Sequence, residues 1–537
     1  MAEPPAKRRR TSDADGPQRP APASLTREIS PPMRRSAAPL QQEHQKQHRK
    51  LIPSPFRLTS IRDLPSHSNV GAVSLHDLLG DPLIAECWEF NYLHDIDFLI
   101  NHFDEDVRSS VNVHIVHGFW KREDLSRLTL EEQASKHQNV TLHTAYMPEM
   151  FGTHHSKMII IFRHDDTAQV IIHTANMIAK DWTNMTDAVW QSPCLPLMNH
   201  PDQGQGDAPS GSGAKFKADM LSYLRAYNTK RNVCKSLVDN LTKYDFSAVQ
   251  GTLIASVPGR HAVEDDPSVT RWGWAAMKHA LRSVPVQEGK SEIVAQISSI
   301  ATLGGTDAWI QRTLFEALSP TGKSKTNPTF KVVFPTADEI RRSLDGYASG
   351  GSIHTKTQSA QQQKQLQYLR PIFCHWANDT ESGLPSDGIS SNIGVKDAGR
   401  QRAAPHIKTY IRYNSSNAID WALLTSANIS KQAWGEAVNG VKELRIASWE
   451  IGVLVWPEVL AGDKGARMVG VFKRDMPKEE DLGARDEKSG SDNETATLVG
   501  LRIPYSLPLQ KYGPNEDPWV ATADYRELDW MGQTWGV

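Results

Sequence analysis

The sequence His-Ser-Lys-Met-Ile-Ile-Ile-Phe at residues 155–162 returns, in altered form, as His-Ile-Lys-Thr-Tyr-Ile-Arg-Tyr at residues 406–413. Each copy opens an apolar run with His-x-Lys, and a second apolar run follows that ends in Thr-Ala-Asn176 or in Ser-Ala-Asn428. The His-to-Asn spacing is 21 residues in the first copy and 22 in the second, and a Trp stands six residues after each Asn. Two copies with such closely matching spacing predict an internal duplication.

The residue types that the two copies share indicate chemistry rather than packing. A duplicated strand can keep its pattern for packing alone, but His and Lys two residues apart lie on the same face of a strand, where packing does not require polar groups. Two Lys supply positive charge, two Asn supply amide donors, and two His supply a nucleophile and an acid. Together these groups suit a tetrahedral oxyanion such as a phosphodiester, and they require no metal or other cofactor.

Duplicated halves that face each other across a pseudo-twofold axis also predict a mechanism. One His from each half would lie on opposite sides of the phosphorus, as in-line displacement requires. A neutral His attacks the phosphorus, while a protonated His gives its proton to the leaving oxygen and then activates water. Two imidazoles in opposite protonation states predict a bell-shaped pH profile.

The two halves resemble the phospholipase D superfamily, and more closely the eukaryotic tyrosyl-DNA phosphodiesterases of the 3′-end-processing type. The motif of the broad superfamily has an Asp after His-x-Lys, whereas this branch has an Asn well downstream, as here. The resemblance covers about residues 70–535. The stretches that carry it are Phe151-Gly-Thr-His-His-Ser-Lys157, His173-Thr-Ala-Asn-Met-Ile178, Ser256-Val-Pro-Gly-Arg260, Gln296-Ile-Ser-Ser299, Pro405-His-Ile-Lys-Thr-Tyr410, Thr425-Ser-Ala-Asn-Ile-Ser-Lys431 and Trp449-Glu-Ile-Gly-Val-Leu454.

By position, the resemblance implies the roles of the four strongest site residues. His155 would be the nucleophile, His406 would be the general acid and then the base, and Lys157 and Lys408 would hold the phosphate. The supporting donors would be Asn176 and Asn428.

The resemblance also implies one acidic residue in the site. Glu450 matches a position behind a catalytic imidazole, where a carboxylate would fix the tautomer of the ring. The corresponding position in the first half is Asp187, where the best-known relatives carry Gln. A carboxylate near a catalytic His would raise the pKa of that His, unlike an amide. For either acid taken alone, an ordinary solvated position remains an alternative.

Substrate binding is expected to involve hydroxyl and amide donors that contact DNA phosphates rather than bases. The positions that match DNA contacts of the family are Ser298, Ser299, Thr302, Ser430 and Lys431. Hydroxyls of this kind also serve as turn and capping groups, and that alternative stays open. Phe151 could stack on a base, although packing in the core is an equal alternative.

Length and composition agree with two domains and exclude little else. The chain has 537 residues, which is more than a single hydrophobic core normally accommodates, and its hydrophobic content of 39% permits sizeable cores. We expect a first domain at residues 66–244 and a second at residues 245–537. The formal net charge of −2 means that any basic surface for nucleic acid must be local. We expect a monomer.

The cysteines, the apolar runs and the histidines point to an intracellular protein without a metal. The four cysteines are scattered, with no Cys-x-x-Cys pair, and we expect reduced, buried thiols. No apolar run approaches 18 residues, so we expect no membrane span. His114 and His117 would lie on opposite faces of a strand, which is poor spacing for metal ligands.

Residues 1–65 have a different character from the rest. Residues 1–50 hold 11 basic and 5 acidic residues, and the segment is poor in aromatic residues, so we expect a disordered tail. Lys7-Arg-Arg-Arg10 resembles a nuclear-import signal, which predicts a nuclear location. Met33-Arg-Arg-Ser36 resembles a kinase phosphorylation site or a binding site for repair-protein partners. A merely solvated basic tail is the alternative for both.

Alternation from about Leu51 predicts a mixed α/β fold with two similar α-β-α sandwich domains related by a pseudo-twofold axis. Expected strands are residues 112–116, 140–143, 157–162, 170–173, 251–257, 292–297, 331–334, 408–413, 421–424 and 451–456. Expected helices are residues 90–104, 122–136, 214–242, 269–282, 305–318 and 336–346. Expected insertions or mobile loops are residues 199–214, 351–366 and 461–495, the first and last of them disordered.

Three functions follow from these expectations. The first is a nuclear repair enzyme that acts on DNA 3′ ends, hydrolyses 3′-phosphotyrosyl bonds and other 3′ adducts, and frees DNA from stalled topoisomerase I through a phosphohistidine intermediate. The second is a binding module that kept the fold and lost turnover, but every position that turnover needs is filled. The third is a lipid or general phosphodiesterase, which would need Asp in the motif and often an apolar face.

Overall fold

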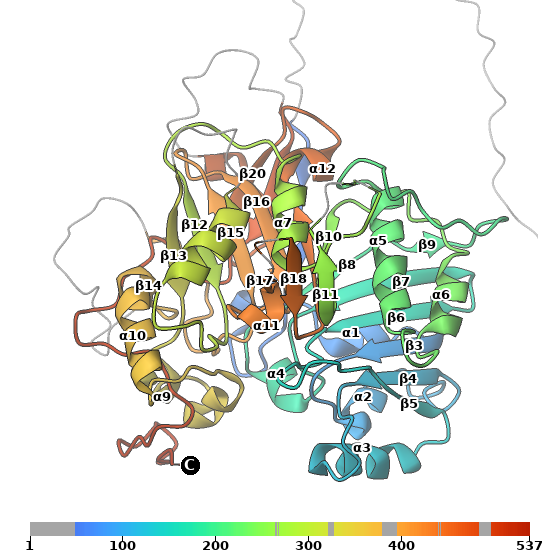
Figure 1. Cartoon of the computed structure of the whole chain (residues 1–537), viewed down its shortest axis with the longest axis horizontal. Coiled ribbons are helices and arrows are strands. Elements are labelled where there is room, and N and C mark those ends of the chain that lie inside the picture. Colours follow the sequence, from blue (N-terminus) through green and yellow to red (C-terminus); the bar gives the residue numbers. More distant parts are fainter. Residues whose placement is uncertain are drawn as a thin grey trace, which may run out of the picture. The chain divides into compact units, whose positions relative to one another are not determined.

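The computed structural model describes residues 49–263, 266, 268–319, 327–378, 395–438, 440, 442–482 and 496–536, and these form two large β-sheets and one small one. In Figure 1 the first sheet runs from blue to green and the second is mainly yellow-green to red. The import signal and the kinase or partner site expected before residue 48 lie outside the described residues.

The first sheet has eight strands, and its central strands are almost continuous runs of buried apolar residues, as expected for strands covered on both faces. In spatial order they are β2 (Phe56–Leu58), β8 (Ala188–Gln191), β7 (Thr167–His173), β6 (Met158–Arg163), β3 (Ile84–Phe90), β4 (Asn112–His117) and β5 (Val140–Thr144), with β9 (Leu195–Pro196) beside β7.

The second sheet has ten strands, and a separate three-stranded sheet lies apart from it. The path of the ten-stranded sheet is β1 (Leu51–Ile52), β21 (Leu498–Arg502), β20 (Arg467–Val471), β16 (Ile419–Thr425), β15 (Thr409–Tyr413), β12 (Glu292–Gln296), β13 (Thr329–Val333) and β14 (Phe373–Cys374), with β19 (Glu450–Val455) between β16 and β10 (Thr252–Ser256). The small sheet is β11 (Gly259–Ala262), β18 (Glu443–Ile446) and β17 (Glu436–Val438).

The duplication appears in the topology of the two large sheets. The order β8-β7-β6-β3-β4-β5 in the first sheet corresponds to β19-β16-β15-β12-β13-β14 in the second. In both, the first three pairs are antiparallel and the last two are parallel. Because β6 and β15 hold the same place, the two His-x-Lys segments that precede them enter equivalent positions.

Helices cover the outer face of each large sheet, and the inner faces share one core. The helices are α1 (Leu75–Leu79), α2 (Ile96–Ile100), α3 (Leu125–Ser135), α4 (Ala179–Thr183), α5 (Gly213–Ala226), α6 (Lys235–Leu241), α7 (Gly273–Leu281), α8 (Glu316–Leu318), α9 (Ala337–Arg341), α10 (Ala360–Leu369), α11 (Lys431–Trp434) and α12 (Pro457–Ala461). The other helical segments are the π-helix η2 (Ile310–Phe315) and the 3-10 helices η1 (Ser66–Ser68), η3 (Gly346–Ser352), η4 (Arg370–Ile372) and η5 (Glu479–Leu482).

The core residues show how these layers pack. Residues of α1 and α2 pack on one face of the first sheet, and residues of α7, η2 and α8 pack on one face of the second. A third cluster joins α5 and α6 to the remaining face of the first sheet and to inner residues of β16 and β19. The mixed α/β fold with duplicated, helix-covered sheets that the sequence predicts is therefore present. None of the described helices combines the length and apolar character that a bilayer crossing requires.

Three expectations about loops and the tail were wrong. Residues 49–65 belong to the folded unit, because β1 pairs with β21 and β2 pairs with β8. The expected loop at residues 351–366 contains the start of α10, whose Ser359 side chain forms a capping box with Gln362. The expected disordered insertion at residues 461–495 contains β20, although residues 483–495 lie outside the described part.

The expected helix at residues 90–104 was mostly wrong as well. The chain there first completes β3, and α2 begins only after the N-cap residue Asp95. Residues 199–212, expected to be disordered, are described as loop and turn before α5.

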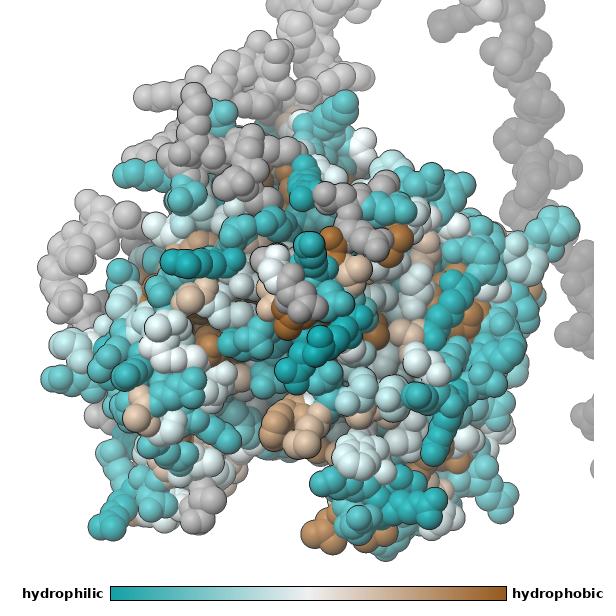
Figure 2. Space-filling model, viewed as in Figure 1, coloured by the Kyte–Doolittle hydropathy of each residue, from teal (hydrophilic) through white to brown (hydrophobic). Residues whose placement is uncertain are grey.

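On the face shown in Figure 2, hydrophobic side chains are scattered among hydrophilic ones rather than gathered in one large patch.

Candidate active site

The two His-x-Lys segments lie in loops just before β6 and β15, and each loop is held by the backbone of the other half. The amide of His155 donates to the carbonyl oxygen of Trp449 at 3.0 Å, and the amide of His406 donates to that of Thr186 at 3.0 Å. The expectation that His and Lys belong to the strands themselves was wrong, because the strands begin at the next residue, Met158 or Thr409.

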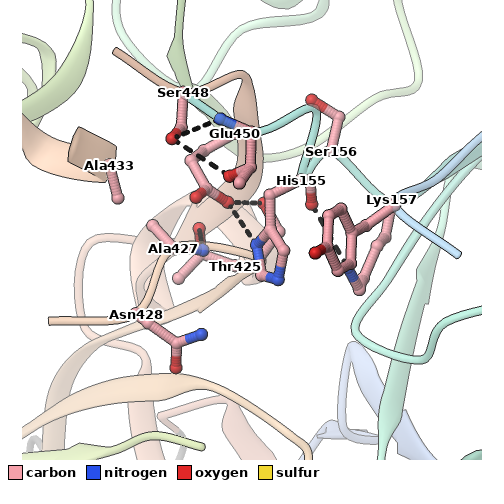
Figure 3. A network of polar contacts seen from close by, with 12 residues as sticks. His155, Ser156, Lys157, Thr425, Ala427, Asn428, Ala433, Ser448 and Glu450 are labelled. Carbon is pink, nitrogen blue, oxygen red and sulfur yellow. Dashed lines mark hydrogen bonds and ion pairs between the residues drawn. The ribbon is translucent and has the colours of Figure 1, made fainter. Parts of the chain in front are cut away.

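The residue after each of these backbone anchors is the carboxylate that contacts the imidazole. Nδ1 of His155 lies 2.9 Å from Oε2 of Glu450, and Nδ1 of His406 lies 3.2 Å from Oδ1 of Asp187. Figure 3 shows the imidazole of His155 and the carboxylate of Glu450 facing each other. Each half therefore supplies the acid for the histidine of the other half, and the Nε2 atom of each ring is left for chemistry.

A hydroxyl group supports each of these carboxylates in the same way. The side chain of Thr174 donates to Oδ1 of Asp187 at 2.6 Å, and the side chain of Ser426 donates to Oε2 of Glu450 at 2.6 Å. Both hydroxyls come from the Thr-Ala-Asn and Ser-Ala-Asn repeats. The sequence therefore carried a signal for these two residues, although neither was predicted to belong to the site.

A second carboxylate, which the sequence did not predict as a site residue, also contacts His406. Oδ2 of Asp181 lies 3.2 Å from Nδ1 of His406 and accepts hydrogen bonds from the amide and the Nδ2 atom of Asn176, both at 2.8 Å. Asp181 is fully buried. Its position five residues after Asn176, next to a Trp of the repeat, was the available signal.

Asn428 is fixed by backbone groups of the segment that follows β12. Its Oδ1 atom accepts hydrogen bonds from the amides of Ser298 at 3.0 Å and Ser299 at 2.9 Å. Because the carbonyl end of the side chain is engaged in this way, the Nδ2 end is the one available to a ligand. Asn428 can therefore act as a donor, whereas Nδ2 of Asn176 already donates to Asp181.

The two lysines of the motifs are fully buried, and each donates to the histidine two residues before it. Nζ of Lys157 lies 3.4 Å from the carbonyl oxygen of His155, and Nζ of Lys408 donates to that of His406. Burial lowers the pKa of Lys157 to about 8 and that of Lys408 to about 7. Within the described ranges neither ammonium group has a carboxylate at ion-pair distance. Two buried cations of this kind form a site for an anion.

Burial also determines the protonation of the two histidines. It lowers the pKa of His155, an effect that the carboxylate of Glu450 partly offsets. Burial, followed by the charges of Lys408 and Lys157, lowers the pKa of His406 well below its usual range. Burial and the nearby Asp181 raise the pKa of Asp187 well above its usual range, which favours the neutral form of this carboxyl group.

Only one group of three potential metal ligands was found among the described residues. Donor atoms of Asp181, Asp187 and His406 lie within 4.8 Å of one another. The same carboxylate oxygens accept hydrogen bonds from Asn176 and Thr174. Hydrogen-bond donors of the chain therefore already contact both carboxylates of this group.

The predicted DNA-contact residues do not all lie as expected. Phe151 is 77% exposed, which excludes the core-packing alternative. The hydroxyl of Ser430 caps α11 by accepting from the amide of Ala433, and Nζ of Lys431 pairs with Glu436 at 2.7 Å. Thr302 is exposed and accepts a hydrogen bond from a glutamine side chain. For Ser430 the capping role is therefore observed, and Lys431 would have to exchange a carboxylate for a phosphate.

Comparisons with known proteins agree with this geometry. Residues 55–513 match the family model described as tyrosyl-DNA phosphodiesterase. A probable tyrosyl-DNA phosphodiesterase of Schizosaccharomyces pombe is 30% identical over 92% of this chain and 97% of its own, and one of Caenorhabditis elegans is 30% identical over 96% and 98%. The crystal structure of the yeast tyrosyl-DNA phosphodiesterase superposes with a TM-score of 0.60 at 19% identity, covering 87% of this chain and 98% of that one, which shows the shared fold.

Proposed function

The chain belongs to the tyrosyl-DNA phosphodiesterase family, and from that membership we propose that it hydrolyses 3′-phosphotyrosyl bonds and other 3′ adducts of DNA. In this proposal it is a repair enzyme that releases DNA from stalled topoisomerase I through a covalent phosphohistidine intermediate and leaves a 3′-phosphate. The observation that carries the proposal is the pair of buried lysines, Lys157 and Lys408, each in contact with a histidine whose Nδ1 atom is held by an acid.

In the first step, Nε2 of His155 attacks the phosphorus and the bond to the tyrosyl oxygen breaks. The carboxylate of Glu450 accepts a hydrogen bond from Nδ1–H of His155, which keeps Nε2 unprotonated and aimed at the phosphorus. Lys157, Lys408 and the Nδ2 atom of Asn428 neutralise the negative charge of the equatorial oxygens. The leaving oxygen takes a proton from Nε2 of His406.

Phosphate binding itself would prepare His406 for this role. The positive charges of Lys408 and Lys157 are among the causes that lower the pKa of His406. A phosphate between the two lysines would offset those charges, which raises the pKa of the imidazole and favours its protonated form.

In the second step, His406 has lost its proton and acts as a base. Its Nε2 atom takes a proton from water, the water oxygen bonds to phosphorus, and the bond between phosphorus and His155 breaks. The products are a 3′-phosphate and the enzyme in its starting protonation state. None of these steps uses a metal ion.

The proposal extends to location and partners. We infer a nuclear protein that acts as a monomer and contacts repair proteins through the basic tail of its first 48 residues. Ser299, Thr302, Ser430 and Lys431 would contact the DNA backbone, and Phe151 would stack on a base near the scissile phosphate. Deletion of residues 1–47 tests the first part, because it should leave the activity of the purified enzyme intact and reduce nuclear accumulation.

The deciding experiment is single-turnover cleavage of a 3′-phosphotyrosyl oligonucleotide in EDTA. We expect release of tyrosine, a 3′-phosphate product and full activity with the chelator present. Activity that disappears in EDTA and returns with zinc or magnesium would contradict the metal-free mechanism. A wild-type enzyme that binds the oligonucleotide but never cleaves it would favour the binding-module alternative.

A further inference from the structure

We propose that a basic pocket beside the first sheet binds unpaired nucleotides of the DNA substrate, outside the phosphate site between the two lysines. This inference deepens the proposed function and rests on it. The pocket has a volume of about 390 Å³ and lies where the end of β5, the segment before α3 and the connection from α5 to α6 meet. We call it the β5 pocket. Its lining residues are Trp120, Arg122, Arg127, Thr144, Ala145, Tyr146, Met147, Tyr227, Lys230, Arg231 and Val233.

The charge of the β5 pocket selects an anion. Four lining residues are basic and none is acidic, in a chain whose net charge is −2. Arg127 pairs with Glu131, but Arg122, Lys230 and Arg231 have no carboxylate at ion-pair distance within the described part of the chain. Side chains of one sign that converge without counterions concentrate positive potential and attract phosphate groups.

Two exposed aromatic rings in the same pocket favour a nucleic acid over a simple anion. Trp120 is 56% exposed and Tyr146 is 38% exposed. Nζ of Lys230 lies 5.6 Å from the centre of the Tyr146 ring, so a phosphate-binding cation and a ring occur together. Single-stranded nucleic acids are bound by this combination of basic groups and rings, because a base that is not paired can stack on a side chain.

The floor of the β5 pocket is connected to the nucleophile by direct contacts. Tyr227 lines the pocket, and its hydroxyl lies 3.0 Å from Nε2 of His154, the residue before His155. Its ring stacks at 3.7 Å on Trp449, the residue before Glu450, and the indole NH of Trp449 donates to the carbonyl oxygen of Tyr146. The pocket and the catalytic pair therefore keep a fixed relation to each other.

The segment that connects the pocket to His155 carries two strongly exposed apolar side chains. Tyr146 and His155 are nine residues apart, which limits their separation to about 30 Å. Along that segment Met150 is 85% exposed and Phe151 is 77% exposed. A strand that starts at the phosphate site can pass these side chains and enter the pocket within about nine nucleotides, taking the 3.4 Å spacing of a DNA strand.

Substrate length therefore provides the test. Single-stranded 3′-phosphotyrosyl oligonucleotides of three and fifteen nucleotides are compared with the wild type and the double variant Lys230→Glu/Arg231→Glu. We expect the variant to raise KM for the fifteen-nucleotide substrate on the order of 10-fold, with kcat and all constants for the trinucleotide unchanged. The slope of log KM against log salt should fall by about 1.4, or 0.7 for each lost phosphate contact.

Two further variants control for folding and for general charge. Lys235→Glu/Lys243→Glu makes the same charge change at exposed positions on and just after α6, and it should leave the length dependence intact. Trp120→Ala should weaken binding of the long substrate without any change of charge. Equal loss in the control variant, or equal loss on the trinucleotide, would overturn the pocket assignment.

The outcomes also separate this inference from the proposed function. If the wild type cleaves both substrates and the Lys230→Glu/Arg231→Glu variant behaves identically, only the pocket assignment is contradicted. A wild type that cleaves neither substrate sinks the proposed function. If the variant responds only when tyrosine is replaced by a longer tyrosyl peptide, the pocket belongs to the adduct, and the nucleotide assignment is wrong.

Discussion

Nδ1 of His155 lies 2.9 Å from Oε2 of Glu450, although 295 residues separate the two in the sequence. The amide of His155 also donates to the carbonyl oxygen of Trp449, so both the backbone and the ring of His155 are placed by the second half of the chain. Because His406 is placed by Thr186 and Asp187 in the same way, neither half can form a complete site alone.

Replacement of Glu450 tests whether this contact orients the nucleophile. Glu450→Ala should slow formation of the covalent intermediate on the order of 100-fold, the low end of what positioned acid–base groups contribute. It should change KM little, because Glu450 does not contact the phosphate. The measurement is rapid-quench single turnover, with Glu105→Ala at an exposed position as the control. An unchanged rate would remove Glu450 from the site.

The two acids beside His406 should respond differently to amide replacement. Burial and the nearby Asp181 raise the pKa of Asp187 well above its usual range, which favours the neutral form that an amide resembles, so Asp187→Asn should lower kcat only a few-fold. Asp181→Asn removes the acceptor of two hydrogen bonds from Asn176 as well as the contact to His406, and it should cost about 100-fold or more. The reverse order of effects, measured by kcat at pH 7, would contradict this assignment.

The sequence predicted the repeated strands well because their signal is local. Both β6 and β15 are buried strands that begin just after His-x-Lys, and β6 is an apolar run from Met158 to Phe162. It missed β20 because a short strand lies among charged residues that resemble a disordered insertion. It missed α10 because a Gln-rich helix has little apolar periodicity, although the Ser359 capping box was a usable signal.

The site was predictable as a set of residues but not as a set of pairs. The duplication showed which His, Lys and Asn residues correspond, whereas the exchange of acids between halves depends on how the two sheets pack. That packing is set by apolar side chains of β7, β16 and β19 in one shared core. No sequence pattern linked Asp181 to His406, because Asp181 is brought there by α4 after the chain leaves β7.

The buried lysines predict how activity depends on pH. In the free enzyme burial lowers the pKa of Lys408 to about 7 and that of Lys157 to about 8. These groups lose their positive charge as the pH rises through those values, so kcat/KM should fall above about pH 7. A bound phosphate raises both pKa values, so kcat should persist to higher pH. Profiles of both constants from pH 5 to 10 check this, and a flat kcat/KM up to pH 9.5 would contradict it.

An ion pair outside the candidate active site predicts how the stability of the folded protein depends on pH. Burial of His375 disfavours its charge, but Glu339 and Glu516 outweigh that effect and raise its pKa to about 9. Because the folded-state pKa exceeds the usual 6.5, the stabilisation is complete below about pH 6.5 and is lost as the pH rises through 9. His375→Asn should therefore lower Tm at pH 6 and change it little at pH 10. Equal shifts at both pH values would indicate a packing defect instead.

In the proposed mechanism His406 has two successive roles, and one substitution can separate them. As an acid it protonates the tyrosyl oxygen, but a phenolate is already a fair leaving group with a pKa of about 10, so loss of the proton donor should slow the first step only moderately. Hydrolysis of the phosphohistidine needs a base to activate water. His406→Asn should therefore let DNA become attached to His155 and remain there, which gives a band of protein-linked DNA on a denaturing gel. The double variant His155→Ala/His406→Asn is the matched control and should show no such band. If His406→Asn is inert without a trapped adduct, or turns over normally, the assignment of His406 as acid and then base is wrong.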